Sequence, residues 1–219
     1  MIIVRKLIIL AASAKFNNYC VAGVDVETGE WIRPISEKPE LEEAVPIDDL
    51  KYPDNSRVEL LDVAEIKFSD RAADNPIQPE NFFYNDKYYW QKVGRMTLQE
   101  VIDLRGFDLR DKIFYNSERS IFGANVINFP ERESLLLLPV ENLFISIEDA
   151  GDHKKFFADF VYQGKNFHRF SVGDIAVRKK FADKSAGKHF FKDNAVVTFS
   201  LTNPYYKNAE CYKMLAQIF

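Results

Sequence analysis

Cysteine and histidine are scarce in this chain, which has two cysteines and three histidines among its 219 residues. The cysteines, at positions 20 and 211, are too few and too far apart to form a disulfide framework, which indicates a reducing compartment such as the cytoplasm. The histidines have neither the His-Glu-x-x-His spacing nor a nearby cysteine pair, so no zinc site is indicated. We therefore expect a cytoplasmic protein without a metal or another cofactor.

Membrane and catalytic signatures are missing as well. The sequence has no run of about 18 apolar residues, the length that predicts a membrane-spanning helix. It contains neither Gly-x-x-x-x-Gly-Lys-Ser/Thr nor Gly-x-Gly-x-x-Gly, and its carboxylates are not spaced as an obvious catalytic pair. Cys20 is expected on the inner face of a strand, as a small core residue rather than a nucleophile. We expect no membrane association and no catalytic activity.

The apolar segment Leu7–Ala12 follows two basic residues and precedes small residues, as in a signal peptide. Its length of six residues falls short of the usual ~7–15. We expect it to be a buried barrel strand that is not cleaved.

Aromatic residues are abundant, with 19 phenylalanines, 10 tyrosines and 2 tryptophans. This composition favours strands, and alternating apolar residues support the same interpretation. Short strands separated by turn residues are typical of small barrels, so the expected fold class is mainly β. The expected single strands are 4–12, 57–68, 135–138, 140–147 and 195–201, and the expected hairpins are 20–35 and 156–172. The last segment, 212–218, is expected to be a strand, with a helix as the alternative.

A helix and a charged segment interrupt the strands. Thr97 and Glu100 form a capping box before a short apolar stripe, and Gly106 suits the position after its end, which predicts a helix over 97–105. A charged segment around Pro130 then separates two β-rich parts. We expect one barrel in residues 1–130 and a second in residues 131–219, in tandem and with one or two short helices.

Charge is distributed unevenly along the sequence. Residues 1–150 contain 17 Lys+Arg against 27 Asp+Glu, and residues 151–219 contain 12 against 6. The second half is therefore basic, although the whole chain has a net charge of −4. Such asymmetry indicates either a polyanionic partner for the basic half or mutual docking of the two halves.

The hairpin over 20–35 carries a candidate binding pair. Gly29 suits its turn, and Pro34 marks a strand end. Trp31 and Arg33 then share one face of the return strand, where a ring can stack on a base and a guanidinium can contact a phosphate. The alternative is a core tryptophan beside a surface arginine. With Lys15, these two residues form the candidate nucleic-acid groove of the first barrel.

The strongest binding signal is the segment 178–192, in which cations alternate with aromatic residues. Cations on a mobile loop can follow a phosphate backbone, and aromatic rings can stack on bases. The alternative is a solvated loop that its phenylalanines anchor to the barrel. The candidate nucleic-acid-binding residues of this segment are Arg178, Lys179, Lys180, Lys184, Lys188, Phe190 and Lys192.

A series of short motifs in a fixed order resembles the dual OB-containing domain family of prokaryotes. One position departs from the family pattern, because Gly173-Asp174-Ile175 stands where that family has Thr-Asp-Pro. The matching motifs are Ser13-x-Lys15, Cys20-Val-Ala-Gly23, Gly29-x-Trp31-Ile-Arg33-Pro34, Pro79-Glu-Asn81, Phe160-x-Tyr162-x-Gly164-Lys165-x-Phe167, Ser200-Leu201 and Cys211-Tyr212-Lys213.

The resemblance implies two OB-like barrels in tandem over almost the whole chain. It also implies nucleic acid as a partner, together with a place in prokaryotic defence or conflict systems, in which an effector protein would be a second partner. The function that this favours is a non-catalytic nucleic-acid-binding module that is accessory to such a system.

Two alternatives remain open from the residues. One is a protein–protein interaction module, which would use the acidic first half or the aromatic cluster at 82–90. The other is a small-molecule or nucleotide sensor, or an enzyme, with a pocket between the barrels that holds Cys20, His168 or Asp174.

Overall fold

The computed structural model describes residues 2–15, 17–151 and 153–219, and the backbone alone for residues 70–72. The chain forms two compact units. The first comprises the chain up to residue 75 and residues 79–106, and the second comprises residues 76–78 and 107–219. The boundary therefore lies at 106/107 rather than near residue 130, because Ile113, Ile121 and Val126 pack into the core of the second unit.

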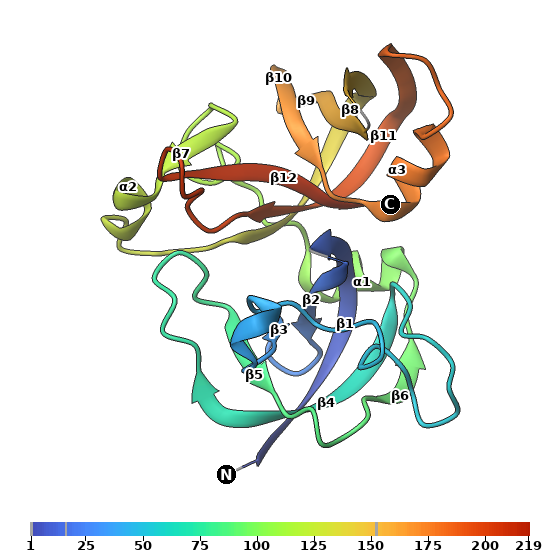
Figure 1. Cartoon of the computed structure of the whole chain (residues 1–219), viewed down its shortest axis with the longest axis vertical. Coiled ribbons are helices and arrows are strands. Elements are labelled where there is room, and N and C mark those ends of the chain that lie inside the picture. The colour runs from blue at the N-terminus through green and yellow to red at the C-terminus, as the bar shows by residue number, and fades with distance from the viewer. Residues whose placement is uncertain (1, 16, 152) are drawn as a thin grey trace. The chain divides into compact units, whose positions relative to one another are not determined.

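The first unit is a closed barrel. Its strands are β1 (Ile2–Lys15), β2 (Asn18–Asp25), β3 (Trp31–Ile35), β4 (Asp62–Ala72), β5 (Asn81–Tyr84) and β6 (Gln91–Arg95). The order is β1-β2-β3-β5-β4, and β4 pairs back onto β1 to close the ring (Figure 1). Strands β3 and β5 are parallel. This five-stranded connectivity is that of an OB fold, and β6 extends the sheet beside β4.

The expected hairpin is confirmed as β2 and β3, with Gly29 at a φ of 73° in the turn. The face that points into the barrel differs from the expected one. Val21, which pairs with Ala12, joins the hydrophobic core, whereas Cys20 does not. Residues on both faces of β2 are buried, Ala22 among them, so apolar alternation alone did not reveal the inner face.

A long loop, residues 36–61, joins β3 to β4 and contains one short 3-10 helix, Pro39–Leu41. The strand expected over 57–68 begins only at Asp62. Leu61, just before it, has a φ of 68°, which lies outside the extended region of the backbone. The β4 strand then continues to Ala72, beyond the expected end.

The buried carboxylate of Asp62 fixes this start of β4. It accepts hydrogen bonds from the Tyr52 hydroxyl at 3.0 Å and the Glu59 N–H at 3.1 Å. It also forms ion pairs with Lys92 at 2.7 Å and Arg95 at 3.0 Å. Burial raises the pKa of Asp62, but the Lys92, Glu59 and Tyr52 hydrogen bonds outweigh it and hold the pKa below its usual value.

Helix α1 (Leu98–Arg105) confirms the predicted helix and its capping box. Thr97 Oγ1 accepts from the Glu100 N–H at 3.2 Å, and the Thr97 N–H donates to the Glu100 carboxylate at 2.6 Å. At the other end, the Arg105 guanidinium lies 5.2 Å from the centroid of the Trp31 ring. The helix therefore packs against the hairpin of β2 and β3.

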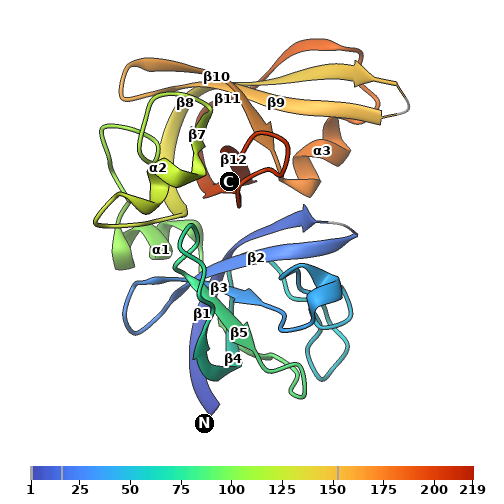
Figure 2. The same ribbon diagram turned by 60° about the vertical axis from the view of Figure 1, so that its left-hand side comes forward.

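The second unit is also a closed barrel. Its strands are β8 (Leu135–Ala150), β9 (His153–Tyr162), β10 (Lys165–Val172), β11 (Gly187–Leu201) and β12 (Glu210–Ile218). They follow the order β10-β9-β8-β11-β12, and β12 closes the ring by parallel pairing with β10 (Figure 2). The connectivity is that of the first unit, so the chain contains two OB barrels. The final segment is a strand, as preferred from the sequence.

Residues before β8 complete the second unit. They include β7 (Ser120–Phe122), which pairs with β12, and α2 (Gly123–Ile127). The segment 76–78, which lies between β4 and β5 in the sequence, also belongs here. Ile77 is buried in this core, and Gln78 donates a hydrogen bond to the Leu201 carbonyl at 2.8 Å.

The segment 178–192 is not a mobile loop. Residues up to Phe181 belong to α3 (Ile175–Phe181), and β11 begins at Gly187, so only residues 182–186 form a loop. Val177 and Phe181, four residues apart, bury one face of the helix. The loop is anchored, since the Lys154 ammonium donates to its carbonyl oxygens at two positions, both at 2.7 Å. Among the described residues, no helix is long and apolar enough to cross a bilayer.

Candidate functional site

An exposed aromatic surface lies on the outside of the second barrel. Along β8, Leu143 and Ile145 point into the core, so Phe144 between them points outward. Phe190 of β11 pairs with Phe144. Phe157 of β9 pairs with Ser146, which is also outward. We call Phe144, Phe157 and Phe190, with Lys188 of β11 and Arg169 of β10, the outer aromatic face.

Rings and cations are in direct contact on this face. The rings of Phe144 and Phe190 meet edge to face, with centroids 5.5 Å apart. The Lys188 ammonium lies 4.7 Å from the Phe144 ring centroid, and the Arg169 guanidinium lies 4.5 Å from that of Phe157. Phe190 is 54% exposed. An exposed ring with cations beside it is suited to stacking on a base.

Carboxylates on the same face neutralise its cations. Lys188 forms an ion pair with Asp159 at 2.7 Å, and Arg169 forms a two-point ion pair with Glu148. Burial raises the pKa of Asp159, but the hydrogen bonds from Lys188 and from the Arg169 N–H hold that pKa below its usual value. The outer aromatic face therefore consists mainly of aromatic rings, and its net positive charge is small.

The position of this face within the barrel is informative. Two of its members, Phe157 on β9 and Arg169 on β10, lie on the second and third strands of the second barrel. The face of these two strands is where OB folds bind oligonucleotides and oligosaccharides. In β10 a bulge between Phe167 and Phe170 turns His168 and Arg169 outward. Arg169 there has a φ of 59°, and its N–H donates to Asp159 at 2.9 Å. Bulges of this kind often redirect side chains at functional sites.

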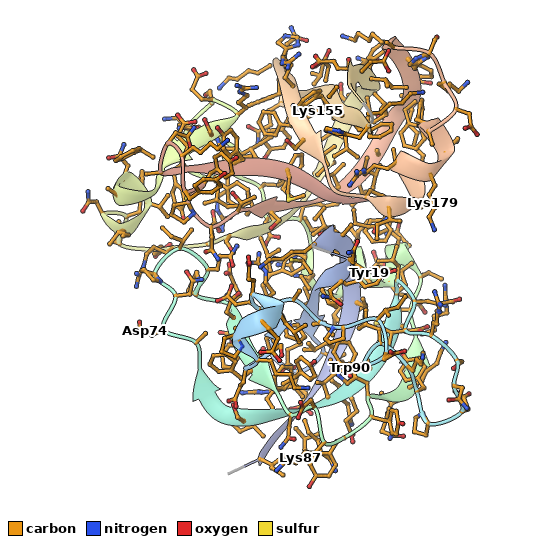
Figure 3. All side chains as sticks on the ribbon, viewed as in Figure 1. Tyr19, Asp74, Lys87, Trp90, Lys155 and Lys179 are labelled. Atoms are coloured by element: carbon orange, nitrogen blue, oxygen red, sulfur yellow. The ribbon has the colours of Figure 1, made fainter. Side chains whose placement is uncertain are left out.

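The cations predicted in 178–192 are divided between two sides of the sheet. Lys188 and Phe190 lie on the outer aromatic face. His189, which pairs with the core residue Ile145, lies on the opposite side, and its ring is 6.0 Å from that of Phe181 in α3. Figure 3 shows Lys179 on α3. It also shows Lys155 of β9, which pairs with Glu148 of β8, at a distance from Lys179. The single binding segment expected from the sequence is therefore two surfaces.

On the α3 side, cations cover aromatic rings. The Arg178 guanidinium lies 5.7 Å from the Phe156 ring and the Lys180 ammonium 4.9 Å from the Phe191 ring. Lys192 also approaches Phe191, at 5.8 Å. Lys179 and Lys184 are exposed, and neither forms an ion pair within the part of the chain that the structure describes.

The charge asymmetry is smaller when it is counted by unit. The first unit has 13 Lys+Arg against 19 Asp+Glu, and the second has 16 against 14. The acidic residues between 107 and 150 belong to the second unit and offset its lysines. Net charge alone therefore gives only a weak argument for a polyanionic partner of the second unit.

The hairpin residues of the first unit do not form the expected surface pair. Arg33 is only 5% exposed, and its guanidinium lies 3.4 Å from the Asn81 side-chain oxygen. It is buried where β3 pairs with β5, opposite Asn81 in the register. Trp31 is half-buried beneath Arg105, and Lys15 donates a hydrogen bond to the Glu42 carbonyl. We leave Arg33 out of the candidate surface.

Several residues of the N-terminal family motifs have packing roles. An added Cβ at Gly23 would lie 2.5 Å from the Ile8 carbonyl oxygen, so this strand contact requires glycine. Ser13 and Pro34 are buried. Burial raises the pKa of the Cys20 thiol, although Lys15 and Arg33 act in the opposite direction. A thiol held in its protonated form is a poor nucleophile.

Asp174 holds α3 to the end of the chain. Its carboxylate accepts from the Val177 N–H at 3.0 Å as the helix N-cap. It also accepts from the Gln217 side chain at 2.6 Å and the Ile218 N–H at 2.9 Å. The role of this aspartate is structural and does not depend on the missing threonine and proline of the family motif.

The motif at 211–213 is structural as well. Cys211 lies in the barrel core, and burial raises its pKa to about 11. Lys213 is 1% exposed, and its amine donates to the carbonyl and side-chain oxygens of Asn116, both at 2.6 Å. The Tyr212 hydroxyl accepts from Asn208 at 2.8 Å.

Sequence reasoning missed Phe144, Phe157 and Arg169, three of the five residues of the outer aromatic face. A signal for the two phenylalanines existed, because each stands at an outward position of an alternating strand, where a polar residue is usual. Arg169 had no such signal, since the bulge that exposes it is a property of strand pairing. Within the described ranges, no group of three or more histidine, cysteine, aspartate or glutamate side chains could hold a metal ion.

Comparisons with known proteins agree with the two barrels. No curated protein and no solved structure matches the chain significantly. The model of the Dual OB-containing domain matches residues 5–218, which is nearly the whole chain. The chain therefore belongs to the family of proteins with a Dual OB-containing domain.

Proposed function

We propose that the second barrel binds single-stranded nucleic acid on its outer aromatic face. The observation that carries the proposal is the exposed Phe190 ring in contact with Phe144, with Lys188 beside them on the outer surface of an OB barrel. Bases of a single strand stack on such rings without regard to sequence, and adjacent cations contact the phosphates. The bases of a duplex are stacked on one another and do not offer their faces.

Stacking supplies most of the affinity in this proposal. Lys188 and Arg169 are already paired with carboxylates, so a phosphate must compete with Asp159 and Glu148 for them. Few counterions are then released on binding. We expect about two phosphate contacts, hence a slope of log affinity against log salt that is shallow, at about 0.7 per contact for a single strand.

Binding of a labelled oligothymidine of about 16 nucleotides, the upper size of an OB site, tests the proposal by fluorescence anisotropy. Phe190→Ala should weaken binding about 5- to 150-fold, the loss of one stacked base at ~1–3 kcal/mol, with the salt slope unchanged. Phe122→Ala is the matched control, since Phe122 is 48% exposed in the same unit but lies on β7. It should leave the affinity unchanged.

Lysine variants separate the two cationic surfaces. Lys188→Ala should reduce the salt slope by about 0.7. The pair Lys179→Ala and Lys184→Ala, on the α3 side, should leave both affinity and slope unchanged. If the α3 pair of substitutions weakened binding more than Lys188→Ala does, the interface would lie on the α3 side of the sheet instead. A wild-type affinity weaker than ~10⁻⁴ M at low salt for every strand tested would end the nucleic-acid proposal.

We further propose that the chain is a cytoplasmic module that catalyses nothing itself. The raised pKa values of its two cysteine thiols and the fully hydrogen-bonded Asp174 support this more than they support an enzyme. In a prokaryotic defence or conflict system it would bring nucleic acid to a separate effector protein. Co-purification of the natively expressed protein, with and without nuclease, tests for such an effector.

A protein-interaction module is the second candidate, and a feature of the first unit favours it. Tyr89 is 63% exposed and Val93 is 49% exposed, both close to or within β6, whose residues are all exposed. Exposed apolar side chains beside a solvent-facing strand suit a protein partner. Tyr89→Ser with Val93→Ser should reduce recovery of a co-purifying protein without changing oligonucleotide affinity.

A further inference from the structure

An open pocket of about 510 Å³ adjoins the outer aromatic face of the second unit. One wall is the loop with Ser117, Glu118 and Arg119, and the other is β10 with Asn166 and the bulge at 168–169. Arg169 lines the pocket and also covers the Phe157 ring, so the pocket and the face are continuous. The volume is within the usual range for small-ligand sites, ~300–1,000 Å³.

Both walls are held in place by hydrogen bonds. The buried amine of Lys213 donates twice to Asn116, and the Asn116 side chain in turn accepts from the Glu118 N–H at 3.1 Å. The Lys213 N–H donates to the Arg119 carbonyl at 2.9 Å. On β10, Asp159 fixes the bulge through the Arg169 N–H. The backbone of both walls is therefore fixed, which lowers the part of the cost of binding that comes from ordering the walls.

The polar groups of the pocket have mixed character. Glu118 and Arg119 are exposed, and in the part of the chain that the structure describes neither side chain makes an ion pair or a hydrogen bond. A carboxylate in the lining of the same pocket disfavours a phosphate, which it would repel. Arg119 and Glu118 together instead suit a ligand that has hydrogen-bond acceptors for the guanidinium on one edge and donors for the carboxylate on the adjacent edge.

We propose that this pocket binds one unstacked guanine of the strand held on the outer aromatic face. The inference rests on the proposed function and adds a sequence preference to it. Guanine presents the acceptors O6 and N7, which arginine contacts with two hydrogen bonds, and an amino group that a carboxylate accepts. Arg119 takes the first role and Glu118 the second. Adenine has a donor where guanine has O6, and thymine lacks the amino group.

Oligothymidines with a single central guanine, adenine or cytosine test the proposal against oligothymidine itself. The wild-type protein should bind the guanine strand at least about fivefold more tightly, the lower limit for one two-point base contact. Arg119→Ala and Glu118→Ala should each remove this preference and leave the affinity for oligothymidine unchanged. Glu131→Ala, an exposed glutamate of the same unit away from the pocket, is the control and should keep the preference.

The outcomes separate this inference from the proposed function. Equal affinity for all four strands overturns the guanine site and leaves stacking on the outer face intact. A guanine preference that survives both Arg119→Ala and Glu118→Ala also overturns it, because the preference then arises elsewhere. Absence of binding to every strand overturns both. Because Glu118 and Arg119 are surface residues, thermal unfolding should be the same for the variants and the wild type.

Discussion

At the scale of single residues, the most unusual group is the amine of Lys213. It is 1% exposed, and its two hydrogen bonds both go to Asn116. Among the residues that the structure describes, no carboxylate forms an ion pair with it. Burial lowers its pKa to about 7 from 10.5, with Glu118 acting in the opposite direction. A neutral amine has two N–H donors, which is the number that Asn116 accepts.

This predicts a stability that rises with pH above neutrality. Between about pH 7 and pH 10.5 the unfolded state keeps the Lys213 proton and the folded state does not, so raising the pH favours folding. Below pH 7 both states are protonated, and the full penalty of burying the charge applies. Relative to Lys213→Met, the wild-type free energy of unfolding should gain about 2 kcal/mol from pH 7 to pH 9, since one pKa unit is worth ~1.4 kcal/mol.

Urea unfolding of both proteins at a series of pH values measures this gain. The comparison with Lys213→Met cancels the contributions of the other titrating groups. A difference between the two proteins that does not change with pH would show that Lys213 keeps its ordinary pKa, and that the two Asn116 hydrogen bonds hold a charged ammonium.

At the scale of elements, the contact between β1 and β2 explains one family motif. Gly23 pairs with Ile9, and the strands approach so closely there that a side chain does not fit. Gly94 of β6 differs, since an added Cβ would lie 3.8 Å from Val63, an ordinary contact distance. In the first unit, Gly94 therefore has room for a side chain and Gly23 has none.

Gly23→Ala should destabilise the first unit by about 1–3 kcal/mol, because the new Cβ forces β1 and β2 apart. Gly94→Ala should change the free energy of unfolding by no more than about 0.5 kcal/mol, as is usual for surface positions. Chemical unfolding measured by tryptophan fluorescence follows the first unit, since Trp31 and Trp90 both belong to it. Equal stability of the two variants would contradict the close approach of the strands.

At the scale of the whole molecule, the two units are not consecutive in the sequence. Residues 76–78 leave the first unit between β4 and β5 and belong to the second. Ile77 is 3% exposed in the core of the second unit. The chain therefore passes between the units three times, at 75/76, 78/79 and 106/107.

Ile77→Ala should destabilise the second unit by about 2–5 kcal/mol, the range for large-to-small changes in a core. Amide hydrogen exchange should then accelerate in β8 to β12 more than in β1 to β5, although residue 77 lies between strands of the first unit in the sequence. Asp74→Ala, at an exposed position three residues earlier, is the control. Faster exchange confined to β1 to β5 would show that the segment supports the first unit instead.

The sequence by itself determined the fold class, most elements and the two barrels. Local signals were sufficient where the structure is local: the capping box placed α1, Gly29 placed a hairpin turn, and apolar alternation placed β9 and β10. The ordered motifs identified the family over nearly the whole chain. These features depend on residues near one another in the sequence, so propensity and periodicity are enough to find them.

Only the tertiary structure decided which residues are available to a ligand. Arg33 is buried where β3 pairs with β5. The cations of 178–192 lie on opposite sides of the sheet because α3 and β11 interrupt the expected loop. The outer aromatic face joins residues from β8, β9, β10 and β11, which strand pairing brings together from distant positions. Exposure and proximity follow from long-range pairing, and a single sequence carries no local signal for either.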